Sequence, residues 1–234
     1  RDPIGEPLQC GELVPSNSQM KQLCPNVPDI DDLLQTPDSA ISRRTEWLHL
    51  VPPSGKPLRF RFEGQILNRV LHDKALVDLA KKSGAKYCVG TRVIGVNDSV
   101  VTLKDGRRFS GDVLVGAGGH YDILRKTMWD ENSLNIPVKF SLLNGTFPDV
   151  VELHFGSMAP GGYAWVIPKS GGANIGVGIQ RKYANGKSLN HYYKSFLDRF
   201  EGEIVFSGAG SLPMSGTINS FVKENVLLVG DAAG

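Results

Sequence analysis

The sequence has few cysteines, few histidines and little net charge. Its three cysteines and five histidines show no metal-ligand spacing, and so few thiols favour a reducing compartment over a disulfide framework. The net charge is only +2 and the basic residues are dispersed, which argues against a nucleic-acid partner. The sequence also lacks the roughly 20-residue apolar run of a membrane span and the pattern of a signal peptide. These absences predict a cytoplasmic protein.

What is present is typical of a globular enzyme. Of the 234 residues, 41% are hydrophobic and 21% are charged, enough for one large domain or two small ones. Short apolar strands at 112–115 and 226–229 run into glycine-rich turns, as in parallel α/β sheets. From about 136 to 180 the strands become longer and alternate, which predicts an antiparallel sheet. We therefore expect an α/β, Rossmann-like nucleotide domain interrupted by an α+β domain.

Periodicity places the individual elements. The spacing predicts helices over three segments: 68–83, 121–129 and 188–200. Alternation and turn residues predict strands at 47–51, 58–62, 86–89, 92–97, 100–103, 138–143, 150–155, 163–167 and 173–179. Residues 1–45 are rich in Pro, Asn, Ser and Asp and are expected to be mostly loop.

Two segments carry most of the chemical information. After the strand at 226–229, Gly230 allows close approach of a ligand and Asp231 can accept hydrogen bonds from a sugar hydroxyl. The alternative is a plain turn with a solvated carboxylate. In the second segment Tyr163, Trp165 and Ile167 share one strand face, and Pro168 is expected to end the strand. That face suits an elongated apolar ligand, although spacing alone favours an ordinary aromatic core.

The motifs together resemble a known family. Gly230-Asp231 is similar to the second FAD motif of the flavin hydroxylase superfamily. Tyr163-x-Trp165-x-Ile167-Pro168, followed by Gly176, resembles the aromatic-x-Trp-x-Phe-Pro motif of geranylgeranyl reductases, with Ile in place of Phe. Pro7-x-x-Cys10-Gly11-Glu12 resembles the same family's Pro-x-x-Cys-Gly-Glu signature, whereas a flavin halogenase would have Gly-Glu-Ser there.

The resemblance implies an FAD-dependent oxidoreductase that reduces isoprenoid double bonds in lipid biosynthesis. The substrate would be a geranylgeranylated lipid or diphosphate, and NAD(P)H or a ferredoxin-type protein would supply electrons. The protein would visit the membrane surface peripherally. Cys10 is the implied catalytic residue. The implied cofactor-binding residues are Cys10, Gly11, Leu13, Arg69, Val93, Gly230 and Asp231. The implied substrate-binding residues are Tyr163, Trp165, Pro168 and Gly176.

The resemblance also implies domain boundaries. An incomplete FAD-binding domain would comprise 1–45, 64–130 and 220–234, and the prenyl-binding domain 46–63 and 131–219. The family's N-terminal Gly-x-Gly-x-x-Gly unit and its C-terminal part are not in this sequence, so we expect a segment of a longer protein. One departure lies at Gly116-Ala117-Gly118-Gly119, where the family has Gly-Ala-Asp-Gly-x-x-Ser; Gly118 replaces the Asp and Asp122 the Ser.

Two alternatives remain at this point. Ile167 and the order of the motifs also fit a flavin monooxygenase or halogenase, because halogenases carry a related aromatic-x-Trp-x-Ile-Pro sequence. Gly118 and Asp122 would also fit a flavin or isoprenoid binder without catalytic activity.

Overall fold

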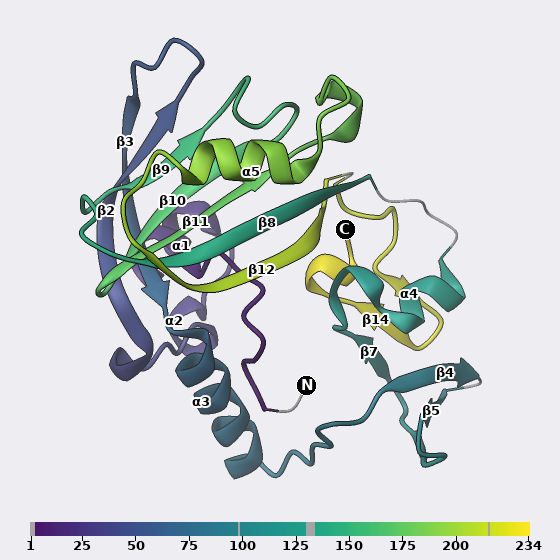
Figure 1. The fold of residues 1–234 in the computed structure, drawn as a ribbon. Coiled ribbons are helices and arrows are strands. Elements are labelled where there is room, and N and C mark those ends of the chain that lie inside the picture. Colours follow the sequence, from purple (N-terminus) through teal and green to yellow (C-terminus); the bar gives the residue numbers. More distant parts are fainter. Residues whose placement is uncertain (1–2, 98, 130–133, 215) are drawn as a thin grey trace. The chain divides into compact units, whose positions relative to one another are not determined.

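The computed structural model describes residues 3–97, 99–129, 134–214 and 216–234. The chain forms two compact units (Figure 1). The large unit comprises Asp2–Tyr87 and Pro137–Gly210, and the small unit comprises Cys88–Ile136 and Ser211–Gly234. Residues 3–45 and 64–87 therefore pack in the large unit, whereas the assignment of these segments to a flavin domain stays a prediction.

The large unit contains an eight-stranded sheet in the order β1-β3-β2-β9-β10-β11-β8-β12. Its strands are β1 (Leu13–Pro15), β2 (Ile41–Val51), β3 (Leu58–Leu67), β8 (Asn135–Asn144), β9 (Val151–His154), β10 (Tyr163–Lys169), β11 (Gly172–Gly178) and β12 (Glu203–Pro213). β9, β10, β11 and β8 pair antiparallel, whereas β2 and β9 run parallel. The predicted antiparallel sheet is confirmed, and the β2–β3 hairpin extends it.

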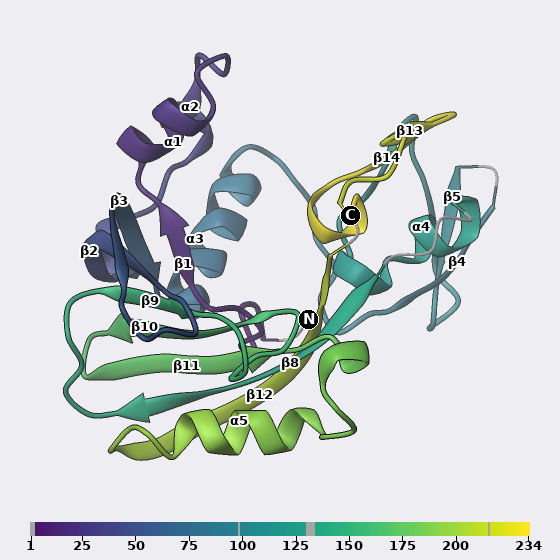
Figure 2. The same ribbon diagram turned by 90° about the horizontal axis from the view of Figure 1, so that it is seen from above.

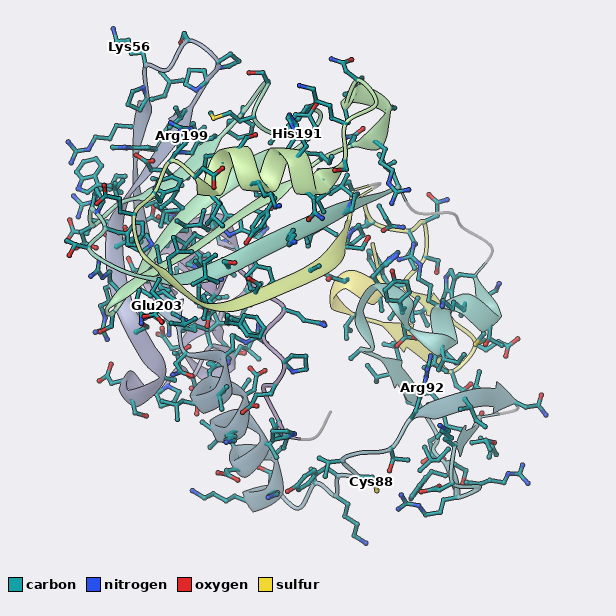
Figure 3. The ribbon with its side chains drawn as sticks, viewed as in Figure 1. Lys56, Cys88, Arg92, His191, Arg199 and Glu203 are labelled. Carbon is teal, nitrogen blue, oxygen red and sulfur yellow. The ribbon has the colours of Figure 1, made fainter. Side chains whose placement is uncertain are left out.

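The β2–β3 hairpin is longer than its sequence pattern indicates. Gly55, at a φ of 77°, forms the turn, and Lys56 lies at the tip of the hairpin (Figure 3). β2 begins at Ile41 and β3 continues to Leu67, where Ile66 and Leu67 are buried. Both strands contain many polar residues, so their sequence lacks the apolar alternation that predicts a strand. Pairing with β1 and β9 stabilises them without that alternation.

Helices lie on both sides of the sheet (Figure 2). On one side α5 (Leu189–Leu197) packs Phe196 against Val166 and Ile175. α1 (Asn17–Leu23), α2 (Ile30–Leu33) and α3 (Arg69–Lys82) gather on the other side. The helix predicted at 68–83 is confirmed: Asn68 caps its start, and Gly84, at a φ of 89°, follows its end.

The small unit contains two short sheets. β7 (Leu114–Gly116) and β14 (Val226–Leu228) run parallel, with β13 (Val222–Lys223) antiparallel to β14. The second sheet consists of β4 (Val93–Asn97), β5 (Val100–Leu103) and β6 (Arg108–Ser110). Helix α4 (Ile123–Met128) packs Leu124 into a core with Val226 and Leu228. The predicted return to a parallel strand at 226–229 is therefore confirmed.

Two sequence-based expectations were wrong, and one strand was missed. Residues 86–89 are not a strand. β12 was not predicted: its short apolar start at 204–206 is followed by Ser, Gly and Ala residues, which are a weak strand signal. Pro168 does not end its strand: it pairs with Ala173 inside β10, beyond Ala164–Val166, where β9 pairs on the other side. A strand that is paired on one side tolerates proline. None of the described helices has both the length and the apolar character needed to cross a bilayer.

Candidate functional site

The cysteine motif lies directly against the aromatic strand of the large unit. The carbonyl oxygen of Cys10 accepts a hydrogen bond from Asn174 Nδ2 at 3.0 Å. A Cβ on Gly11 would lie 3.0 Å from Ile167 Cδ1, so glycine permits this close approach. The structure thus brings together two motifs that are about 150 residues apart in the sequence.

Glu12 fixes the shape of this loop. Its φ of 69° is uncommon for a residue with a side chain, and it is only 2% exposed. The backbone N–H of Glu12 donates to Cys10 Sγ at 3.2 Å, and its carboxylate forms an ion pair with Lys169. The second carboxylate oxygen accepts from the backbone N–H of Arg69 at 3.5 Å. A buried carboxylate needs such partners, so Glu12 ties the loop to both β10 and α3.

Trp165 and Gly176 form a single packing arrangement. These residues lie opposite one another on β10 and β11, and a Cβ on Gly176 would come within 2.2 Å of the indole ring. Because Gly176 has no side chain, the indole lies directly over its backbone, which is therefore not open to a ligand. Trp165 is only 6% exposed, and its ring lies 5.8 Å from that of Tyr163, centroid to centroid.

Asn174 connects the aromatic strand to the cysteine loop. Its Oδ1 accepts from Trp165 Nε1 at 2.9 Å while its Nδ2 donates to Cys10, so a fully buried amide bridges the two motifs. Sequence reasoning missed this residue. The available signal was an asparagine within the apolar run Ala173-Asn174-Ile175, because a polar side chain in a buried strand requires partners.

Cys10 also influences the ionisable groups beside it. Burial raises the pKa of Tyr163, and the proximity of Cys10 raises it further. The pKa of Arg69 is raised, first by its hydrogen bond with Asp73 and also by Cys10. Arg69 contacts Asp73 through two nitrogens, at 2.9 and 3.0 Å. The guanidinium has five N–H donors, of which two serve Asp73, and Cys10 lies beside the others.

The remaining predicted residue of the large unit is Leu13. It begins β1 and pairs with Ile66 of β3. This pairing holds the end of the cysteine loop at the edge of the sheet.

The small unit presents a different arrangement around Gly230 and Asp231. Gly230 has a φ of 60°, and a Cβ there would meet no atom within 4 Å. Asp231 is exposed, while Arg125 donates to the carbonyl oxygen of Ala232 at 3.1 Å. The guanidinium of Arg125, which is 6% exposed, therefore holds the backbone of the turn and leaves the carboxylate of Asp231 accessible.

The departures at Gly118 and Asp122 compensate for one another. Asp122 caps α4, because its Oδ1 accepts from the backbone N–H of Leu124 at 2.8 Å and of Arg125 at 3.1 Å. Its Oδ2 accepts from Gly118 N–H at 2.7 Å. A Cβ on Gly118 would lie 2.7 Å from this oxygen, so a side chain there conflicts with the carboxylate. The chain thus has a carboxylate beside this turn, supplied from four positions later.

Two further residues of the small unit bear on the predicted cofactor. Val93 begins β4 and pairs with Leu103, with a register shift before Gly95. His120 has a buried Nδ1 without a hydrogen-bond partner among the described residues. Burial lowers the pKa of His120, the charges of Arg125 and Lys126 lower it further, and Asp231 acts in the opposite direction.

The predicted residues thus fall into two groups. The large unit brings together Cys10, Gly11, Tyr163, Trp165 and Gly176, with Arg69 near Cys10. The small unit contains Val93, Gly230 and Asp231. The convergence of Cys10 and Asp231 on one flavin ring stays a prediction.

Comparison with known proteins links this arrangement to one family. Residues 134–209 match the model of the geranylgeranyl reductase catalytic domain. Digeranylgeranylglycerophospholipid reductase 3 of Methanosphaera stadtmanae is 27% identical over 260 residues, which cover 99% of this chain and 62% of that protein. The chain therefore spans about three fifths of the length of this relative.

Solved structures show the same fold. A geranylgeranyl bacteriochlorophyll reductase-like protein from Thermoplasma acidophilum superposes with a TM-score of 0.80 at 25% identity, covering 98% of this chain and 62% of that one. A triple mutant of the flavin-dependent brominase Bmp2 superposes with a TM-score of 0.68 at 16% identity, covering 100% of this chain and 65% of that one, a likeness of fold alone. The predicted fold class is confirmed, and so is the resemblance of the chain to the geranylgeranyl reductases.

Proposed function

We propose that the chain is part of an FAD-dependent oxidoreductase that reduces geranylgeranyl double bonds in lipid biosynthesis. The observation that carries the proposal is the contact of the Cys10-Gly11-Glu12 loop with the Trp165 strand through Asn174. The relatives named as digeranylgeranylglycerophospholipid reductases support the same activity.

Both units contain features that fit FAD. The open turn at Gly230 and the exposed carboxylate of Asp231 suit the hydroxyl groups of a ribityl chain. Among the described residues the buried Nδ1 of His120 has no hydrogen-bond partner, which leaves a hydrogen-bonding position for a ligand in the same unit. In the large unit, the N–H groups of Arg69 that do not contact Asp73 suit a diphosphate, and Gly11 and Leu13 would contact the cofactor from the loop. Val93 would contact the adenine through its backbone. When bound and reduced, FAD supplies the hydride for alkene reduction.

The face of Tyr163 and Trp165 would bind the prenyl chain. Tyr163 is partly buried and its raised pKa keeps the phenol neutral, which suits contact with an apolar chain. Gly176 leaves the space that the Trp165 indole fills, and Pro168 follows Ile167 within the same strand. A fixed aromatic wall aligns a flexible substrate, and alignment of reacting groups is worth up to about 7–11 kcal/mol of the barrier.

Cys10 would hold the proton that the second alkene carbon receives. Its sulfur already accepts the N–H of Glu12, so its own S–H remains available as a donor in another direction. The ion pair of Glu12 with Lys169 keeps the loop in this orientation. Electrons would come from NAD(P)H or a ferredoxin-type protein. The enzyme would work in the cytoplasm at the membrane surface, where its lipid substrate lies.

The test is lipid reduction by the purified full-length protein. Incubation with FAD, dithionite and a geranylgeranyl glycerophospholipid is expected to add one H₂ per double bond, measured by mass spectrometry. Cys10→Ala is expected to lower the rate about a hundredfold, the usual effect of losing a general acid. Cys24→Ala is the matched control and should retain the rate.

Three outcomes would contradict the proposal. An unchanged lipid mass would remove the activity. Oxygen-dependent turnover of an aromatic substrate without lipid reduction would favour the monooxygenase or halogenase alternative. Stoichiometric FAD binding without turnover would favour a non-catalytic binder.

A further inference from the structure

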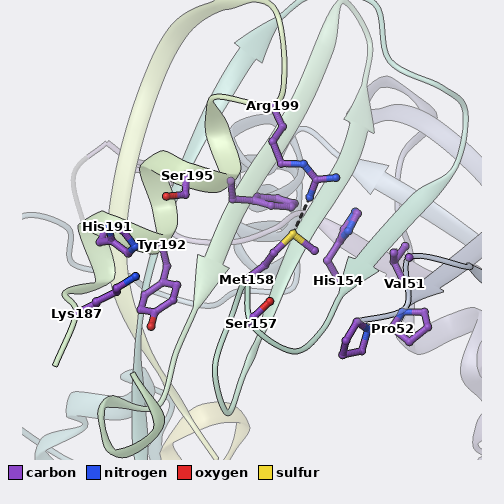
Figure 4. A pocket seen from close by; sticks show the side chains of 13 residues that line it. Val51, Pro52, His154, Ser157, Met158, Lys187, His191, Tyr192, Ser195 and Arg199 are labelled. Carbon is purple, nitrogen blue, oxygen red and sulfur yellow. Dashed lines mark hydrogen bonds between the residues drawn. The ribbon is translucent and has the colours of Figure 1, made fainter. Parts of the chain in front are cut away.

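A second pocket lies beside α5, on the side of the sheet opposite the Trp165 indole. Its volume is about 380 Å³. Loops after β2 and β9 and the exposed edge of α5 form its walls (Figure 4). It shares no residue with the site proposed for FAD and the prenyl chain. The lining residues are Val51, Pro52, Pro53, Gly55, His154, Ser157, Met158, Lys187, His191, Tyr192, Ser195, Phe196 and Arg199.

The lining contains several cationic or titratable groups and no carboxylate. Lys187 and His191 lie at one end of the pocket and Arg199 and His154 at the other (Figure 4). Within the described part of the chain, neither Lys187 nor Arg199 forms an ion pair. Arg199 Nη1 lies 2.7 Å from Met158 Sδ, a weak acceptor, and the guanidinium carbon lies 5.5 Å from the centroid of the Phe196 ring. The described residues offer its remaining N–H donors no other acceptor. The pocket therefore attracts an anion.

His154 supplies an independent indication of a ligand. It is 4% exposed, and its Nε2 lies 3.0 Å from Glu152 Oε2. Its buried Nδ1 has no partner in the portion of the chain that the structure describes. Buried polar atoms without partners are rare in native proteins, so this nitrogen is a candidate for contact with a bound group. In the protonated ring both nitrogens are donors, and Nδ1–H would then donate to an anion.

The pocket is larger than a single small anion requires. A neighbouring hollow of about 410 Å³ shares Ser157, Lys187 and Tyr192 with it. Val51, Pro52 and Phe196 add apolar walls to the first pocket. The combined space suits an anionic head that is attached to a larger organic group.

We infer that this pocket binds the phosphate group of a phosphate ester. Phosphate offers oxygens in several directions at once, which matches the fork-shaped guanidinium of Arg199 and the His154 ring at one end of the pocket. Lys187, at the other end, would face the rest of the ester. A planar carboxylate has only two oxygens to offer the first group of donors. A soluble metabolite and the headgroup of a lipid present the same phosphate chemistry, and the test below separates them. The inference does not depend on the proposed reductase activity.

The test compares three probes on the purified protein. Calorimetry measures binding of sn-glycerol 1-phosphate and of inorganic phosphate, and co-sedimentation measures binding to phosphatidylcholine vesicles containing phosphatidylglycerol. Arg199→Gln is expected to weaken ester binding about tenfold, the effect of losing one charge-assisted contact. Lys194→Gln removes one charge from α5 outside the pocket and should change the affinity less than twofold.

The outcomes separate the sources and the alternatives. If Arg199→Gln weakens glycerol phosphate binding and Lys194→Gln does not, the ligand is a soluble ester. If this difference between the variants is seen only with vesicles, the ligand is a lipid headgroup. Nitrogen NMR of the histidine rings should then show a ligand-induced shift at His154 and none at His72. Equal losses of affinity in Arg199→Gln and Lys194→Gln would indicate a diffuse basic surface and would overturn the inference. Tighter binding of inorganic phosphate than of either ester would also overturn it, as would the absence of binding of any probe at millimolar concentration.

Discussion

The cysteine loop of the large unit and the glycine–aspartate turn of the small unit are built in opposite ways. The loop is connected on every side: Asn174 reaches Cys10, Lys169 reaches Glu12, and the Trp165 indole fills the space above Gly176. The turn is connected through its backbone alone, where Arg125 contacts Ala232. Gly230 has open space around it and Asp231 is exposed. Side-chain contacts within the protein thus hold the loop, whereas the turn presents an exposed carboxylate and open space to a ligand.

The largest expected effect tests the close packing of the loop region. Gly176→Ala is expected to lower the free energy of unfolding by about 1–3 kcal/mol, because the new Cβ overlaps a fixed indole ring. Gly95→Ala is the matched control: it also lies in a strand, but a Cβ there meets nothing within 4 Å. That change should be neutral or stabilise by about 0.5 kcal/mol. Urea unfolding measures both, and equal effects would show that the indole is free to move.

The sequence predicted the loop region better than its internal connections. Alternation placed Tyr163, Trp165 and Ile167 on one face, as observed. It could not show that Trp165 fills the gap at Gly176, since that contact depends on the register between β10 and β11. Nor could it show Asn174 or the pair Glu12–Lys169, because residues 157 positions apart meet only once the sheet has formed.

Local signals were sufficient where short-range geometry decides the structure. The caps of α3, at Asn68 and Gly84, are within a few residues of the helix they end, so their pattern was readable. β12 and the full length of β2 were missed because neighbouring strands, rather than their own composition, stabilise them. The replacement of the family carboxylate by Asp122 was also unreadable, since its bond to Gly118 N–H depends on how the turn folds back.

A smaller effect tests whether the two departures in the small unit are coupled. Asp122→Ser and Gly118→Ala are each expected to destabilise by about 1 kcal/mol, through a lost hydrogen bond and a steric conflict respectively. Serine leaves room for the new Cβ, so the double variant should lose less than the sum by about 0.5 kcal/mol or more. Denaturant unfolding of the four proteins gives this coupling energy. Gly118→Ala combined with Gly176→Ala, in the other unit, should be additive; additivity in the first cycle would contradict the compensation.

The smallest expected effect is a pH dependence of stability, which involves the unit that contains the turn and not the unit that contains the loop. The pKa of His120 is lowered below its ordinary value of 6.5, chiefly by burial. Below that pH the unfolded chain binds a proton that the folded chain resists, so stability falls as the pH drops from 6.5 through the folded pKa. His120→Gln should remove this decline. His72→Gln, in the large unit, is the control and should leave the decline in place. Thermal unfolding between pH 7 and pH 5 makes the comparison, and a decline that persists in His120→Gln would assign the effect to another group.

His120 lies in the same unit as Asp231. A flavin that occupies the open turn should therefore also alter this pH dependence, whereas a ligand bound only at the loop region should not.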